Sequence, residues 1–306
     1  MKATLFHRSV HLQDQSLLEL QPSCPFCAST NRLRIAELQK NPEVLLLHCH
    51  DCHASSASRM PTTEALGQYY SHYYDDKKEK ITLDMPDRMA CHIFRHTKQV
   101  ADHNKGREVS MLDYGGGDGS ISILLAQKFL ESGSKAVTIT LIDYDKTPVK
   151  APDDRISIAR VDSLSETSCM SMDLVIASAV IEHIPQPKEV LIDLLSRLKL
   201  GGVFYARTPY VEPLSKVAGL LGARFDFTFP AHVHDLGPRF WNSILRLIDH
   251  EGQFCILRST PSIVETSFRQ HFFRTLMAHL LKAPGYLFKE SYRFVGGWEI
   301  FIQRQN

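Results

Sequence analysis

The sequence predicts an α/β fold in which a doubly wound, mostly parallel sheet of seven strands follows a small cysteine-rich unit. Two observations carry this prediction. From Val109 onward, short apolar runs alternate with amphipathic stretches, and strands that alternate with helices form a parallel sheet covered on both faces. Residues 1–60 contain two pairs of cysteines and little else that could make a core.

Seven apolar runs account for the strands of the predicted sheet. They are residues 109–114, 137–143, 156–161, 173–177, 203–206, 254–258 and 298–303. Amphipathic stretches predict helices at residues 121–130, 188–198 and 239–249. Residues 145–154 hold two prolines and leave little room for a crossover helix. The aromatic, mildly basic segment 263–290 predicts a helix inserted between the last two strands.

The composition of the 306-residue chain excludes several classes of protein. Hydrophobic residues make up 43% and charged residues 23%, which is typical of a folded chain. Because 35 lysines and arginines stand against 34 acidic residues, a strongly basic coat for nonspecific nucleic-acid binding is ruled out, although a local patch is not. Since there is no run of ~18 apolar residues and the N-terminus is too polar for a signal peptide, we expect a cytoplasmic protein with no membrane span.

The cysteine pairs predict a structural zinc site. Cys24-Pro-Phe-Cys27 is followed, after 21 residues, by Cys49-His-Asp-Cys52. Two such turns, each with two thiolates, can surround Zn(II) with a tetrahedron, and a metal would stabilise a segment that has so few apolar residues. We therefore predict a zinc ribbon with Cys24, Cys27, Cys49 and Cys52 as its ligands.

Histidines crowd the second cysteine pair, and one of them could replace a cysteine as ligand; they are His48, His50 and His53. The other three cysteines stand alone, and we expect them to be small buried hydrophobic residues: Cys91, Cys169 and Cys255. The odd total of seven and the tight pairing argue against a secreted disulfide framework.

A glycine-rich segment closes the first predicted strand and opens a helix. It reads Asp113-Tyr-Gly-Gly-Gly-Asp-Gly-Ser120. Its glycines at 115, 117 and 119 allow a tight turn and let a ligand touch the backbone, and the helix that follows offers free N–H groups to an anion. A dinucleotide-binding loop requires glycine where Ser120 stands, and the Gly-Lys-Ser/Thr of a P-loop is absent.

The pattern Asp-x-Gly-x-Gly-x-Gly resembles the first motif of class I S-adenosylmethionine-dependent methyltransferases, and the resemblance covers most of residues 109–260. It implies a Rossmann-like sheet with S-adenosylmethionine bound at the glycines. Asp113 would serve the amino-acid end of the cofactor, directly or through water. Asp143 ends the second strand, where the family places an acid on the ribose hydroxyls, and Asp162 follows the third strand, where the family's acid contacts the adenine amino group.

Further segments fit the same family. Residues 173–183 resemble the fourth-strand motif that often ends Leu-Glu-His, and residues 198–202 resemble the Leu-Lys-Pro-Gly-Gly turn, with Leu200 in place of proline. Many bacterial members carry a four-cysteine ribbon and a tyrosine-rich linker ahead of the catalytic domain. The resemblance therefore implies three parts: a zinc ribbon at 1–60, a helical Tyr-rich linker or cap at 61–108, and a methyltransferase domain at 109–306 with the insertion at about 263–290.

Histidines at the carboxyl edge of the predicted sheet are the candidate catalytic bases. His183 follows the fourth strand, and His232 and His234 lie on a loop after the fifth. A histidine near its solution pKa suits general-base work on a hydroxyl, although packing roles remain open for all three. Some related enzymes end the fourth strand with Glu-x-x-Glu-His and hold Mg(II); here Glu182, His183 and His232 or His234 could match, but Ala179 replaces the first acid.

The acceptor site is expected to be walled by three segments outside the central βαβ core. They are the linker Tyr69–Tyr74, the loop His232–His234 and the insertion 263–290. The insertion places Phe268, Phe272 and Phe273 beside Arg269 and Arg274. It could be a packed amphipathic helix, a peripheral contact with a lipid-linked or anionic acceptor, or a dimer face; the sequence leaves the oligomeric state open.

Together these features predict an O-methyltransferase that acts on a hydroxyl of a small molecule, a sugar or glycan, or a natural-product intermediate. The alternative is an RNA or protein methyltransferase that uses the ribbon for recognition. Residues 1–60 hold six Lys/Arg and five Asp/Glu, and four thiolates with Zn(II) add about two negative charges, so the ribbon suits phosphates poorly and nucleic acid is the less favoured partner. The acceptor itself is not identified by the sequence.

Overall fold

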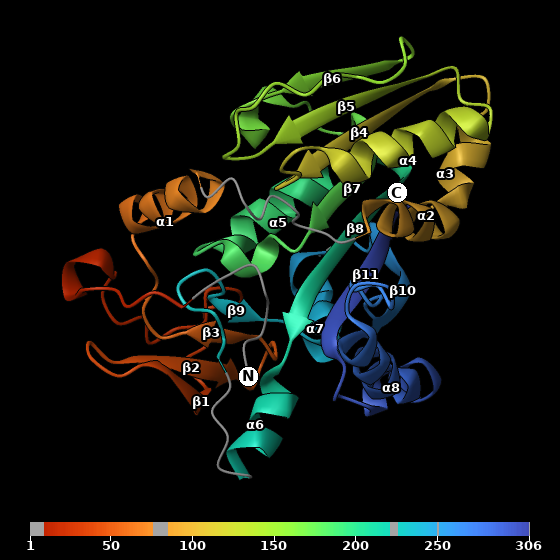
Figure 1. The fold of residues 1–306 in the computed structure, drawn as a ribbon. Coiled ribbons are helices and arrows are strands. Elements are labelled where there is room, and N and C mark those ends of the chain that lie inside the picture. Colours follow the sequence, from red (N-terminus) through yellow and green to blue (C-terminus); the bar gives the residue numbers. More distant parts are fainter. Residues whose placement is uncertain (1–8, 76–84, 221–225, 250, 306) are drawn as a thin grey trace.

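The computed structural model describes residues 9–75, 85–220, 226–249 and 251–305, without the side chains of 71–75. Two sheets organise the chain (Figure 1). The large sheet has the order β10-β11-β8-β7-β4-β5-β6. Its strands are β4 (Glu108–Tyr114), β5 (Ala136–Ile142), β6 (Ile156–Arg160), β7 (Met172–Ser178), β8 (Leu198–Tyr210), β10 (Phe254–Pro261) and β11 (Gly296–Arg304).

This large sheet confirms the predicted fold class. The five strands from β4 to β8 pair in parallel, whereas β11 runs antiparallel to both of its neighbours. The strand of this sheet that comes first in the sequence, β4, lies between β5 and β7, so later strands are added on both of its sides. Such a reversal of strand order opens a crevice at the carboxyl ends of the strands, which is where α/β sheets bind ligands.

The sheet is buried on both faces because its apolar side chains alternate. Met111 and Ile176 belong to one buried cluster, and Leu112 and Val175 belong to the other. The first cluster is completed by α2 (Pro86–His96), α3 (Lys98–His103) and α4 (Ser120–Glu131); the second by α5 (Pro187–Ser196) and α7 (Pro238–Ile248). As expected from its prolines, the connection from β5 to β6 contains no helix.

The small sheet is built from the N-terminal segment and one distant strand. It has the order β1-β2-β3-β9, with β1 (Arg32–Gln39), β2 (Val44–Cys49), β3 (Ser55–Ala57) and β9 (His234–Asp235). All of its pairings are antiparallel. Because β9 comes from the chain after β8, the ribbon and the large unit share backbone hydrogen bonds. Figure 1 shows the small sheet on the side toward which the arrow of β8 points.

Three further helices complete the described part of the fold. They are α1 (Thr63–Asp75), α6 (Glu212–Leu220) and α8 (Phe272–Phe288), with single 3-10 turns at Asp14–Ser16, Leu164–Glu166, Ile181–His183 and Lys289–Ser291. The helix α8 confirms the insertion that the sequence predicts between the last two strands, and it lies beside β10 and β11 (Figure 1). None of the helices within the described ranges combines the length and the apolar character needed to span a bilayer.

Candidate active site and metal centre

The glycine loop between β4 and α4 has a backbone that only glycine accommodates. Gly115, Gly117 and Gly119 have φ of +72°, +55° and +73°, a region that other residues rarely adopt. A Cβ on Gly116 would lie 2.5 Å from the carboxyl carbon of Asp113, and one on Gly115 would lie 2.6 Å from a methyl carbon of Val180. The bare backbone of the loop therefore lines the crevice.

Asp143, at the end of β5, holds this loop in place. Its Oδ2 accepts a hydrogen bond from the backbone N–H of Gly117 across 2.8 Å, and its Oδ1 accepts from the N–H of Asp145 across 2.8 Å. Arg160 donates to the carbonyl oxygen of Gly117 across 2.8 Å, from the end of β6. The acid that the sequence assigns to the ribose thus also fixes the loop, and its carboxylate lies at the crevice.

Asp113 is the buried acid beneath the loop. Burial, with a smaller contribution from the nearby carboxylate of Asp143, raises its pKa to about 7. Its Oδ2 has no hydrogen-bond partner among the described residues. A buried carboxyl oxygen without a partner is costly, so this position fits a cationic group delivered by a ligand.

Asp162 lies in a different environment at the same crevice. Its side chain is largely exposed and forms an ion pair with Lys146. Both residues line the crevice. The three acids that the family resemblance assigns to the cofactor are therefore brought to one edge of the sheet.

One continuous cavity of about 730 Å³ joins this edge to the ends of β7 and β8. All three segments that the sequence places around the acceptor contribute to its lining within the described residues. The linker supplies Tyr70 and the loop supplies His232. The insertion supplies residues 263–266 with Arg274, Ala278, Leu281 and Lys282. Tyr70 also stacks on Tyr144 from the cofactor side, with ring centroids 5.4 Å apart. The side chains of Tyr73 and Tyr74 lie outside the described part of the chain.

Glu182, His183 and His232 come together at the acceptor end of the cavity. Nε2 of His183 lies 3.9 Å from Oε1 of Glu182, and the rings of His183 and His232 have centroids 4.9 Å apart. Burial raises the pKa of Glu182 to about 8 and lowers the pKa of His183 to about 4. Both groups are therefore neutral near pH 7.

The hydrogen bond of His183 assigns its tautomer. Nδ1 lies 2.7 Å from the carbonyl oxygen of Ala231, which can only accept, so Nδ1 carries the ring proton. In a neutral ring this leaves Nε2 as the basic nitrogen. His232 has Nδ1 2.9 Å from Oγ1 of Thr228.

His234 does not line the large cavity, contrary to our expectation of a catalytic role. Its Nε2 lies 2.8 Å from the carbonyl oxygen of Ile184, and its Nδ1 lies 2.9 Å from Oγ of Ser56. Burial lowers its pKa to about 3. Both ring nitrogens therefore connect the ribbon strand β3 to the turn that carries Glu182 and His183, which favours a structural role for His234.

The structure also reveals charged residues in the cavity wall that the sequence did not single out. Arg207 of β8 donates to Oγ of Ser178 across 2.8 Å and forms an ion pair with Glu265. Lys282 of α8 donates to the carbonyl oxygen and the hydroxyl of Ser262 across 2.7 and 2.8 Å. Its burial lowers its pKa to about 8. Arg207 comes from the parallel strand β8, whereas Glu265 and Lys282 come from the segment between β10 and β11.

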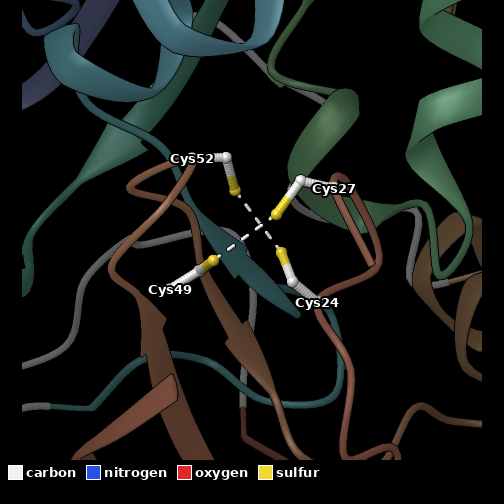
Figure 2. Close-up of side chains that lie close together, drawn as sticks. All are labelled: Cys24, Cys27, Cys49 and Cys52. Carbon is white, nitrogen blue, oxygen red and sulfur yellow. Dashed lines mark hydrogen bonds between the residues drawn. The ribbon is translucent and has the colours of Figure 1, made fainter. Parts of the chain in front are cut away.

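The four paired cysteines lie together at one end of the ribbon (Figure 2). Sγ of Cys24 lies 3.4 Å from that of Cys52, and Sγ of Cys27 lies 3.5 Å from that of Cys49. All four sulfur atoms lie within 4.8 Å of one another. A tetrahedron with Zn–S bonds of ~2.3 Å places sulfur atoms about 3.8 Å apart, so the cluster has the size that Zn(II) requires. None of the three neighbouring histidines belongs to this cluster.

The two cysteine turns have matching backbones, which also fits a metal. The N–H of Ala28 bonds to the carbonyl oxygen of Cys24, and that of His53 bonds to the carbonyl oxygen of Cys49, each across 2.9 Å. Ala28 and His53 both have φ of +61°. Arg32 is the positive charge beside the thiols, so it would offset part of the negative charge of a four-thiolate centre.

Comparison with known proteins identifies the family. The family described as "Methyltransferase domain" matches residues 72–248, more than half of the chain. The protein belongs to this family. It is therefore an S-adenosylmethionine-dependent methyltransferase, as the glycine loop and the order of the strands predict.

Individual relatives are more distant. The "Ubiquinone biosynthesis O-methyltransferase" of Paramagnetospirillum magneticum is 28% identical over 144 residues, which are 45% of this chain and 54% of the relative. The match thus spans about half the length of that relative. Among solved structures, 1,6-didemethyltoxoflavin-N1-methyltransferase of Burkholderia thailandensis is 14% identical, with a TM-score of 0.46 over 79% of this chain and 88% of that chain. A plantazolicin methyltransferase is 16% identical, with a TM-score of 0.47 over 77% and 90%.

Proposed function

We propose that this methyltransferase is an O-methyltransferase whose acceptor is a hydroxyl of a small molecule, a glycan or a natural-product intermediate. S-adenosylmethionine supplies the methyl group. The glycine loop, Asp113, Asp143 and Asp162 would hold it at one end of the cavity. The acceptor would approach from the other end, over β7 and β8. The name of the bacterial relative, an O-methyltransferase of ubiquinone biosynthesis, agrees with this acceptor chemistry.

The observation that carries the proposal is a neutral histidine in the same cavity as the glycine loop. His183 keeps its ring proton on Nδ1, so Nε2 can take the proton of an acceptor hydroxyl. Bound S-adenosylmethionine would supply an electrophilic methyl group to the acceptor oxygen, and its sulfur would keep the electron pair of the carbon–sulfur bond that breaks. The oxygen becomes strongly acidic as its bond to the methyl carbon forms, so even a base with a pKa of about 4 can accept its proton.

The charge of the ribbon supports this acceptor class over nucleic acid. On its outer strand β1, Arg34 lies 3.6 Å from Glu37 and 4.0 Å from Glu43. These acids offset the arginine, so the strand offers little net positive charge to phosphates. We also propose that the ribbon holds a structural Zn(II) through Cys24, Cys27, Cys49 and Cys52.

The test is methyl transfer from S-adenosylmethionine with a labelled methyl group to three panels: hydroxylated small molecules and glycans, total RNA, and protein extracts. The proposal expects labelling in the first panel, with the label stable to mild base as an ether. His183→Ala should lower turnover by about 10²–10⁴-fold while cofactor affinity stays nearly unchanged. Labelling of RNA or protein alone would replace the proposed acceptor class.

A further inference from the structure

The helix α8 has the reverse of the usual arrangement of a surface helix. Its buried residues are Thr275, Lys282 and Gly285, so the inward face carries a charge. Its outward face instead carries Phe273 and Leu287, which are 80% and 79% exposed. A surface helix of a globular protein ordinarily turns its apolar side chains toward the core. We therefore expect the outward face of α8 to bind a partner or a surface that covers its apolar side chains.

The exposed apolar side chains form one stripe along the helix. At 100° per residue, those of Phe273, Met277, Leu280, Leu287 and Phe288 fall within about a third of the helix circumference. Of the 23 large apolar side chains that are exposed in the described part of the chain, 10 lie between residues 268 and 294. That concentration separates this surface from the single apolar side chains scattered over the rest of the protein. We call this stripe the α8 face.

Positive charge borders the α8 face. Residues 262–295 contain five Lys/Arg and two acids. Glu265 pairs with Arg207, and Lys282 is buried, so neither contributes to the exterior. Glu290, which accepts a hydrogen bond from Asn242 across 2.6 Å, then stands against four Lys/Arg. Arg269, Arg274 and Lys289 are exposed. The surface thus combines apolar side chains with a net positive rim.

We propose that the α8 face docks on an anionic lipid surface. The apolar stripe would enter the boundary between headgroups and acyl chains, and Arg269, Arg274 and Lys289 would contact anionic headgroups. The helix α8 has 17 residues, including Pro284, and is about 26 Å long. Because its exposed apolar side chains form one stripe along this length, the helix would lie in the plane of the lipid surface. A second copy of the chain fits less well, because a symmetric contact would bring the same positive rims together.

The docked helix would also place the cavity at the lipid. Arg274, Ala278 and Leu281 line the cavity from α8, and Leu281 is exposed as well. Leu281 therefore lies at the rim of the cavity, next to the α8 face. This position makes the surface a candidate route by which an acceptor reaches the cavity, although the docking itself does not depend on the acceptor.

Co-sedimentation with vesicles tests the proposal without any methyl acceptor. The two vesicle types are phosphatidylcholine alone and phosphatidylcholine with about one third phosphatidylglycerol. We expect the protein to bind the anionic vesicles at least about tenfold more tightly, with binding weakened by salt. The double variant Phe273→Ser/Leu280→Ser should lose at least about another tenfold. The control Leu200→Ser, at an exposed leucine on β8, should bind like the parent.

A spectroscopic measurement reports insertion directly. Both native tryptophans, Trp241 and Trp298, are fully buried, so the emission of Phe273→Trp can be followed as a difference from the parent. A blue shift with anionic vesicles supports docking of the α8 face. No vesicle binding, or equal binding by the double variant, overturns the proposal. A dimer in light scattering that the same double variant dissociates would also overturn it, because the face would then join two copies.

Discussion

The ring of Phe26 packs edge-on against the ring of Phe240, with centroids 4.6 Å apart. Phe26 lies between the first two cysteines, whereas Phe240 lies on α7 of the large unit. Phe26 is fully buried, and Cys24, Cys49 and Cys52 belong to the same buried cluster as the core of the large sheet. The cysteine turns are therefore part of the main core, so the state of the metal centre should affect the whole protein.

Zinc removal should destabilise the catalytic unit as well as the ribbon. We expect one zinc per chain by elemental analysis of the freshly purified protein, with Cys49→Ser losing most of it. Because Phe26 and the thiols are packed into the shared core, we expect Cys49→Ser to lower the unfolding temperature by more than 5 °C or to be insoluble, at a cost of about 2 kcal/mol or more. The matched control is Cys91→Ser on α2, which should keep the metal and the stability. Metal-free parent protein with full stability would contradict the zinc assignment.

His183 and His234 should respond differently to truncation. His183 lines the cavity, so His183→Ala should lower kcat and cost less stability than His234→Ala. His234 bonds to Ser56 and Ile184 in the interior, so His234→Ala should cost about 1–3 kcal/mol of stability. Thermal unfolding and single-turnover rates separate the two effects. A stability loss confined to His183→Ala would reverse the assignment of roles.

Methyl transfer at the acceptor end of the cavity should not require a catalytic Mg²⁺. Glu182, His183 and His232 could offer a metal three ligand atoms within 4.8 Å. The position where related metal enzymes supply a further carboxylate is Ala179. We therefore expect turnover to be unchanged when Mg²⁺ is added to, or removed from, protein that retains its zinc. Metal-assisted transfer would be favoured if the rate of the parent rises with Mg²⁺ while the rate of Glu182→Gln does not.

Cofactor binding should release a proton below pH 7. Burial raises the pKa of Asp113 to about 7, so at pH 6 its carboxyl is mostly protonated in the free protein. A cationic amino group placed beside it favours the carboxylate and lowers that pKa, so binding expels the proton and affinity rises between pH 5.5 and 7. Calorimetry in two buffers of different ionisation enthalpy measures the release. Asp113→Asn should abolish both the release and this pH dependence; a parent protein that releases no proton would remove Asp113 from the amino-acid end.

Elements with strong local patterns were predictable from the sequence. Buried parallel strands need continuous apolar runs, which is why β4 to β7 were predicted within one residue of their ends. The strand β8 is longer than its predicted apolar run 203–206, since it spans Leu198–Tyr210. The glycine loop was found because its positive φ values restrict the residue type. The two cysteine turns also restrict the residue type at their positions, so the ribbon was predictable for the same reason.

Features that depend on tertiary contact were not predictable. The strand β9 has two residues, too few to show a period, and only pairing with β3 makes it a strand. For that reason His234 was interpreted as catalytic, although it connects the ribbon to the turn of His183. Lys282 was also missed, because a lysine in an apolar segment predicts an exposed side chain, whereas here three oxygen atoms around Ser262 and Ile263 accept its hydrogen bonds.

The most direct test of the account is calorimetric titration with S-adenosylmethionine of the parent and of Gly116→Ala. A Cβ at Gly116 meets the carboxyl of Asp113, so this variant should lose at least ~30-fold in affinity, about 2 kcal/mol. The control Gly219→Ala, where a Cβ meets open space on α6, should bind like the parent. The account predicts one site per chain in the parent and in the control. Binding of NAD without S-adenosylmethionine, or equal affinity in Gly116→Ala, would contradict it.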